Sequence, residues 1–170
     1  MRQFIKILFL LDLCLLTLLA FVIKNGADEF GISSDVIYFE IIILLFLLFC
    51  FKIFSAEKIP PETPINECRE IKLIDFLPVI THLMCFFVGF FAPNLTAMLP
   101  VIGITLIIMF ISRAFLFSPM FLLFGYHYYM IITSNGTSLI ILAKGSIIRN
   151  PNDVEFEHLH RVDDMFYIQT

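Results

Sequence analysis

The sequence predicts an all-α membrane fold: a bundle of four transmembrane helices followed by a small C-terminal β-hairpin or three-stranded sheet. Hydrophobic residues make up 59% of the 170 residues, above the roughly 45–50% of soluble domains. They are concentrated in four runs, at 5–23, 37–54, 73–92 and 98–117. Each run is near the roughly 20 residues that a helix needs to cross a bilayer. The chain after residue 118 has no such run.

The first run would span about 28 Å as a helix at 1.5 Å per residue. Bulky residues end it, where a cleaved signal peptide needs small ones, so we expect this helix to be retained. Residues typical of turns separate the four runs: Asn25-Gly26, Pro60-Pro61 and Pro93-Asn94. The last break is short, which predicts that the third and fourth helices form an antiparallel hairpin.

The basic residues predict the orientation of the helices, because cytoplasmic loops carry the excess of Lys and Arg in membrane proteins. With the N-terminus in the cytoplasm, ten of the eleven basic residues fall on the cytoplasmic side: Arg2, Lys6, Lys52, Lys58, Arg69, Lys72, Arg113, Lys144, Arg149 and Arg161. Only Lys24 falls on the other side. We therefore expect residues 1–118 to form a transmembrane domain, with 55–72 as a cytoplasmic loop. Residues 119–170 are expected to form a cytoplasmic tail, so that both termini are cytoplasmic.

The tail carries the signals of a β-hairpin. Residues 124–133 are rich in aromatic and β-branched side chains, which favour strands. Asn135-Gly136 follows, and both positions tolerate the positive φ that a two-residue hairpin turn requires. Residues 139–144 are expected to return as the partner strand. A third strand is expected at 165–169.

The sequence contains no catalytic motif, and we expect neither an enzyme nor a cofactor or metal site. It has no glycine-rich phosphate loop, no recognisable nucleophile and base arrangement, and no Cys or His spacing typical of a zinc site. The net charge of −4 argues against direct nucleic-acid binding, which needs a basic face.

Four ionisable residues inside the apolar runs are candidates for function: Asp12, Asp75, His82 and Arg113. A charge at the bilayer centre costs roughly 2.5–3.5 kcal/mol on insertion scales. Asp12, Asp75 and Arg113 fall in the cytoplasmic half of the predicted bundle. We therefore expect Arg113 to pair with Asp12 or Asp75 and to fix helix packing. The alternative is a proton or ion route through Asp12, Asp75 and His82.

The residues that we expect to bind a partner lie in the tail: Tyr126, Tyr128, Tyr129, Lys144 and Arg149. Aromatic residues and Arg dominate the binding energy of protein interfaces. Aromatic residues also anchor proteins at the bilayer surface. Packing of the three tyrosines against the membrane is therefore the alternative interpretation.

The aromatic segment 124–129, the Asn135-Gly136 turn and residues 139–149 resemble the KwaA family, the membrane subunit of the bacterial Kiwa anti-phage defence system. The short N-terminus and four closely spaced apolar runs fit the same architecture. The resemblance implies a non-enzymatic homo-oligomer of the bacterial inner membrane, a tetramer, that senses phage attack on the envelope. It also implies a soluble DNA-binding partner, KwaB, docked on the cytoplasmic side.

The leading hypothesis is a non-catalytic membrane sensor or scaffold of an anti-phage system that docks a cytoplasmic effector. A bundle with very short external loops has little surface for an extracellular ligand, whereas the tail offers a cytoplasmic platform. The second hypothesis is a small oligomeric ion or proton channel, with Asp12, Asp75 and His82 lining the pore.

Overall fold

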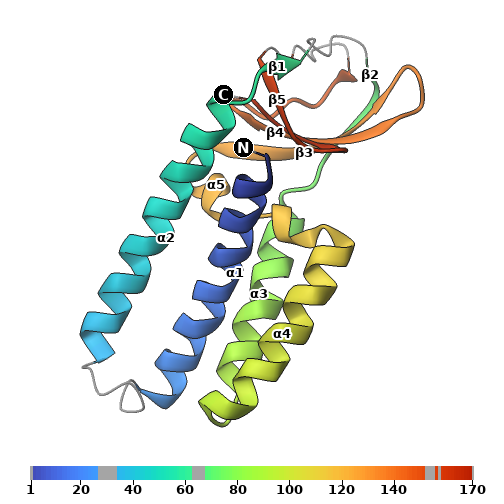
Figure 1. Ribbon diagram of the computed structural model, residues 1–170. Helices are drawn as coiled ribbons and strands as arrows, with labels where there is room; N and C mark the ends of the chain where they lie inside the picture. Colours follow the sequence, from blue (N-terminus) through green and yellow to red (C-terminus); the bar gives the residue numbers. More distant parts are fainter. Residues whose placement is uncertain (1, 27–33, 63–67, 152–155, 157, 170) are drawn as a thin grey trace.

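The computed structural model describes residues 2–26, 34–62, 68–151, 156 and 158–169, and shows a layer of helices with a β-sheet across one end (Figure 1). The helices are α1 (Arg2–Asn25), α2 (Ser34–Glu57), α3 (Phe76–Phe91), α4 (Leu95–Ser112), the 3-10 helix η2 (Ala114–Leu116) and the short α5 (Met120–Leu123). The strands are β1 (Pro61–Glu62), β2 (Cys68–Leu73), β3 (Tyr126–Thr133), β4 (Ser138–Lys144), β5 (Leu159–Asp163) and β6 (Phe166–Gln169). Both ends of the chain lie near the sheet (Figure 1).

The six strands form one mixed sheet in the order β1-β5-β6-β4-β3-β2. The predicted hairpin is confirmed, since β3 and β4 pair antiparallel from Tyr126 opposite Lys144 to Ile132 opposite Ser138. Gly136 in its turn has a φ of +79°, which glycine adopts without steric cost. The predicted third strand, β6, pairs parallel with β4. The remaining neighbouring strands pair antiparallel.

Helix α1 occupies the middle of the helix layer and contacts both α2 and α3. Its residues Ile5, Phe9 and Leu13 are buried, and their spacing of four places them on one helix face. The ring of Phe9 packs on Phe121 of α5 at 5.9 Å and on Phe166 of β6 at 6.2 Å between centroids. One apolar core therefore joins α1, α5 and the sheet.

The outward faces of the helices are also apolar. Large hydrophobic side chains are exposed along α2 (Phe39, Ile42, Phe46, Phe51 and Phe54), α3 (Val79, Ile80, Leu83, Met84 and Phe87) and α4 (Leu99, Ile104, Ile107, Ile108 and Ile111). Soluble monomers rarely expose contiguous apolar patches larger than a few hundred Å². This surface therefore requires a covering other than water.

The predicted all-α fold with four transmembrane helices is wrong. The described chain combines its helices with a six-stranded sheet. Within it, α1 and residues Ile37–Glu57 of α2 are long and apolar enough to cross a membrane. A third span results only if α4 and the segment after it count as one broken span. With 16 residues, α3 is about 24 Å long at 1.5 Å per residue, short of the roughly 30 Å hydrocarbon core.

The third and fourth predicted spans are shorter in the structure than predicted, and each is shortened at the end nearest the sheet. Leu73, the predicted start of the third span, is the last residue of β2 and pairs with Tyr129. The predicted fourth span continues to residue 117, but Arg113 adopts a left-handed φ of 57° and ends α4. The chain then turns by 91° between residues 96–112 and 114–123. Apolar residues beyond each helix end belong to the sheet domain, which hydropathy alone does not distinguish from lipid-facing chain.

Segment 55–72, predicted to be a loop, supplies both edge strands of the sheet. β1 pairs with β5 at one edge, and β2 pairs with β3 at the other. Charged side chains in β2, and the polar residues that precede β5, obscure the alternation of apolar residues from which strands are predicted. Edge strands commonly carry such charges, which discourage pairing with other chains.

We expect Gly89→Ala to destabilise the contact between α1 and α3. A Cβ built on Gly89 would lie 2.0 Å from the carbonyl oxygen of Thr17. The helices must then separate, which lowers the free energy of unfolding by roughly 1–3 kcal/mol, measured by denaturant unfolding in detergent. Gly103→Ala is the matched control, because nothing lies within 4 Å of its Cβ position. Equal stability of the two variants would contradict this close approach.

Candidate functional site

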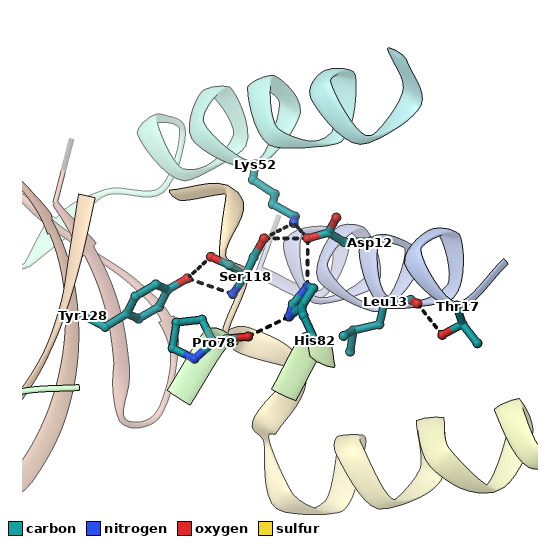
Figure 2. Close-up of polar contacts among 8 residues, drawn as sticks. All are labelled: Asp12, Leu13, Thr17, Lys52, Pro78, His82, Ser118 and Tyr128. Carbon is teal, nitrogen blue, oxygen red and sulfur yellow. Dashed lines mark hydrogen bonds and ion pairs between the residues drawn. The ribbon is translucent and has the colours of Figure 1, made fainter. Parts of the chain in front are cut away.

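A buried ion pair joins α1 to α2 inside the helix layer (Figure 2). Lys52 Nζ donates to Asp12 Oδ2 at 2.6 Å, and Ser118 Oγ donates to the same carboxylate oxygen at 2.6 Å. Lys52 is 0% exposed and Asp12 is 1% exposed. Because an isolated buried charge is very unfavourable, each of these two charges depends on the other.

Three segments that are distant in sequence bring these side chains together. Asp12 lies in the third turn of α1, and Lys52 lies five residues before the end of α2. Ser118 lies between η2 and α5, and it reaches the ion pair because the chain turns back beneath the sheet after α4. The site therefore forms only when the helices and the end of the α4 connection pack together.

Aromatic rings complete the surroundings of the Lys52 ammonium. Its Nζ lies 4.4 Å from the ring centroid of Phe9 and 5.9 Å from that of Phe121. A desolvated cation gains roughly 2 kcal/mol from a favourably placed aromatic face. The rings also keep water away from the ion pair, which strengthens its attraction.

Ser118 connects this ion pair to the sheet. The Tyr128 hydroxyl of β3 donates to the Ser118 carbonyl at 3.0 Å and accepts from the Ser118 N–H at 2.9 Å. Burial raises the pKa of the Tyr128 hydroxyl well above its usual range, so the hydroxyl keeps the proton that it donates. A continuous series of polar contacts therefore runs from α2 through Asp12 and Ser118 to β3.

His82 of α3 approaches the ion pair from the remaining side. Its Nδ1 lies 3.2 Å from the Pro78 carbonyl oxygen, and its Nε2 lies 3.6 Å from Asp12 Oδ2. His82 is 6% exposed. Among the residues that the structure describes, Nε2 has no hydrogen-bond partner.

A second charged network lies where the helices meet the sheet. Lys6 donates to Asp163 at 2.6 Å, and Arg113 contacts the same carboxylate at 3.1 Å. Arg113 also reaches Asp164 at 3.4 Å. Burial by itself raises the pKa of Asp163, but the hydrogen bond and charge of Lys6 and the charge of Arg113 lower it overall. The network holds the β5–β6 turn against the start of α1 and the end of α4.

The predicted pairing of Arg113 with Asp12 or Asp75 is wrong. Arg113 instead pairs with the β5–β6 turn. Asp75 accepts from the Tyr128 N–H at 2.7 Å and lies 2.7 Å from His127 Nδ1. The structure therefore places His82 beside Asp12 but directs the contacts of Asp75 to β3, which gives no support to the hypothesised proton route.

Sequence reasoning missed Lys52 and Ser118 as site residues. Lys52 is an ionisable residue inside the run 37–54, but its place near the end of that run favours interpretation as an interfacial lysine. The available signal was an Asp and a Lys in the cytoplasmic halves of two consecutive apolar runs. Ser118 carries no comparable signal, because its role depends on the turn after α4.

The prediction of an exposed tyrosine surface is wrong. Tyr126, Tyr128 and Tyr129 are at most 6% exposed. Alternate strand residues point to opposite faces, so Tyr126 and Tyr128 pack in the core with the helices, whereas Tyr129 packs with Phe156 on the other face. Lys144 and Arg149 are exposed and stay candidates for partner binding.

A protein-family model described as "Anti-phage protein KwaA" matches residues 5–168, nearly the whole chain. The chain belongs to the KwaA family. KwaA is an anti-phage family, so a role in phage defence follows, and the resemblance noted in the sequence is confirmed. No curated protein and no solved structure matches the chain.

The buried site of this KwaA protein is unsuited to nucleophilic chemistry. Lys52 Nζ lies 3.5 Å from Ser118 Oγ, a pairing that resembles a catalytic Ser–Lys dyad. However, the Ser118 hydroxyl donates its hydrogen to Asp12 and not to Lys52, and Lys52 Nζ is itself bound to the Asp12 carboxylate. Ser118 is 0% exposed, so no substrate reaches its hydroxyl. In the described part of the chain, no group of three or more metal-ligating side chains comes together.

Removing one partner of the ion pair should destabilise the fold far more than removing both. We expect Asp12→Asn or Lys52→Met to lower the free energy of unfolding by roughly 3–5 kcal/mol, because a charge or its binding site is left buried and unpaired. The double variant Asp12→Leu/Lys52→Met should recover most of this loss. Denaturant unfolding in detergent measures all three, and additive losses in the double variant would contradict the direct interaction.

The lowered pKa of Asp163 predicts a pH-dependent stability. The unfolded carboxyl titrates near 3.8 and the folded one at a lower pH. Ionised Asp163 therefore stabilises the fold fully above the unfolded pKa, and this contribution is lost as the pH falls through the folded pKa. The difference in unfolding temperature between wild type and Asp163→Asn should be constant near neutral pH and shrink below about pH 4. A pH-independent difference would refute the assignment.

Proposed function

We propose that the protein is a non-catalytic membrane sensor or scaffold in anti-phage defence, with its sheet end docking a cytoplasmic effector. The observation that carries this proposal is the division of the molecule into two parts. Exposed apolar side chains cover the helix layer, whereas the sheet at one end is packed as in a soluble domain on both of its faces.

Membrane insertion of the helix layer accounts for its unusual surface. Lipid chains are as apolar as the exposed side chains, so they cover the faces of α2, α3 and α4 without loss of solvation. Both α1 and α2 have the length of a membrane span. Association with further copies of the chain covers part of the same surface, and a homo-oligomer is part of the proposal.

The distribution of charge supports a cytoplasmic sheet. Arg2, Lys6, Arg113 and Arg161 form ion pairs at the end where the helices meet the sheet. Lys24 lies at the opposite end of α1, where its Nζ approaches the Ala92 carbonyl at 3.5 Å. The excess of basic residues at the sheet end is the arrangement typical of the cytoplasmic side.

The segment after β4 is the part of the sheet end that best fits a partner. Lys144 and Arg149 are exposed, and Ile147 between them is 44% exposed. A pocket beside them is lined by Lys144, Ser146, Ile148 and Gln169. Two cations flanking an apolar side chain suit an acidic segment with an apolar anchor. We propose that this segment binds a soluble effector such as KwaB, the partner that the family resemblance implies.

The charge-reversal variant Lys144→Glu/Arg149→Glu tests docking. We expect it to reduce co-purification of KwaB from detergent-solubilised membranes roughly tenfold or more, because like charges then face each other. Lys24→Glu, an exposed reversal at the other end of α1, is the control and should retain KwaB. Membrane fractionation should recover both variants with the lipid. Unchanged co-purification with Lys144→Glu/Arg149→Glu, or recovery of the wild type in the soluble fraction, would overturn the proposal.

A further inference from the structure

We propose that the Asp12 carboxylate is the shared partner in a two-position switch, bound either by Lys52 of α2 or by a protonated His82 of α3. In the structure Lys52 occupies Asp12, and His82 is placed to replace it. The inference deepens the proposed function and rests on it for its significance in sensing. Its test does not depend on effector binding.

The hydrogen bonds of His82 determine which nitrogen faces Asp12 without a proton. A carbonyl oxygen only accepts hydrogen bonds, so the contact between His82 Nδ1 and the Pro78 carbonyl at 3.2 Å places the ring hydrogen on Nδ1. The Nε2 lone pair then faces Asp12 Oδ2 at 3.6 Å, acceptor against acceptor. Proton uptake at Nε2 converts this contact into a charge-assisted hydrogen bond. Figure 2 shows the His82 ring already directed toward Asp12.

The site has one anion and therefore accommodates one cation. Asp12 and Lys52 cancel each other's charge in a region bounded by the rings of Phe9 and Phe121. A protonated His82 beside them would leave one buried positive charge uncompensated, which is unfavourable in an apolar interior. Proton uptake by His82 and release of the Lys52 ammonium are therefore coupled, and the net charge of the site is unchanged by the exchange.

Lys52 has a nearby destination when it leaves. It lies five residues before the end of α2, about 7.5 Å along the helix axis. A lysine side chain is long enough to extend over this distance and place its ammonium in the aqueous boundary at the sheet end. The exchange thus releases α2 from α1 without leaving a cation in the interior.

The other titratable groups around His82 do not compete for this role. Cys14 of α1 and Cys85 of α3 are free thiols, which are neutral at about pH 7, and the sequence of α4 contains no ionisable residue. Beyond the ion pair lie Ser118 and the Tyr128 hydroxyl, which bond to each other. Among these described neighbours of His82, Asp12 supplies the negative charge that binds an imidazolium.

The exchange changes how the helices are coupled to the sheet. In the present state Asp12 ties α2 to α1 and, through Ser118, to Tyr128 of β3. After the exchange, Asp12 ties α1 to α3, and α2 loses its ionic link to α1 while keeping its apolar contacts. Two stimuli favour the state in which His82 binds Asp12. One is acidification of the cytoplasm, and the other is displacement of α2 by a disturbance of the membrane. Each lowers the fraction of molecules in which Lys52 is bound to Asp12.

Lysine acylation measures the exchange directly. Full-length protein in detergent is treated with an amine-reactive ester, and modification of Lys52 is quantified by mass spectrometry relative to exposed Lys144, which cancels the pH dependence of the reagent. Histidine is the side chain whose charge change falls within about pH 5–8 when it is unperturbed, so the measurement spans this range. We expect the Lys52/Lys144 ratio of the wild type to rise roughly tenfold between about pH 8 and about pH 6.

Variants at His82 decide whether the switch resides there. His82→Gln and His82→Phe, which stay neutral, should keep Lys52 protected at both pH values, whereas His82→Arg, a permanent cation, should leave it reactive at both. His160→Gln controls for the histidine that contacts the Ile59 carbonyl just beyond α2, and it should retain the pH effect. A wild-type ratio that does not change with pH, or an unchanged pH effect in His82→Gln, would overturn the switch while leaving the KwaB docking test intact.

Discussion

Lys52 and Asp12 place two formal charges inside a core of aromatic and aliphatic side chains. Neither charge is tolerable there alone, so the pair restricts the rotation and depth of α1 relative to α2. Ser118 and Tyr128 extend the restriction to the turn after α4 and to β3. Apolar contacts, by contrast, permit small sliding movements of packed helices. The polar contacts therefore specify one register for the whole assembly.

The helix layer and the sheet differ in where their apolar side chains lie. The helices expose apolar residues and enclose a charged cluster, whereas the strands bury apolar residues on both faces. The change occurs at Arg113, where α4 ends and the chain turns by 91°. The ion pairs of Arg113 and Lys6 with Asp163 lie at this level. They mark the level at which the proposed membrane boundary fits the fold of this anti-phage protein.

Local sequence signals predicted the β3–β4 hairpin and the two long apolar helices. The β3–β4 hairpin follows from Asn135-Gly136 and from the strand-forming residues on either side. The long apolar helices α1 and α2 follow from uninterrupted hydropathy. Edge strands β1 and β2 escaped prediction, because their partners lie far away in the chain. Strand β5 also escaped prediction, although its partner β6 is close in sequence, because its polar residues give no clear apolar alternation. The tyrosines of β3 were predicted to be exposed, since a hairpin considered alone has no second layer to cover them.

By itself, the sequence determined the family, the long apolar helices, the hairpin and the presence of ionisable residues within apolar runs. Tertiary structure alone decided which charges meet. Asp12 or Asp75 was expected to pair with Arg113, but the 91° turn after α4 carries Arg113 to the sheet and Ser118 to the ion pair, and Lys52 binds Asp12 instead. Pairing depends on distances of a few ångströms between separate helices. Hydropathy and spacing along one chain contain no information about such distances until the helices are packed.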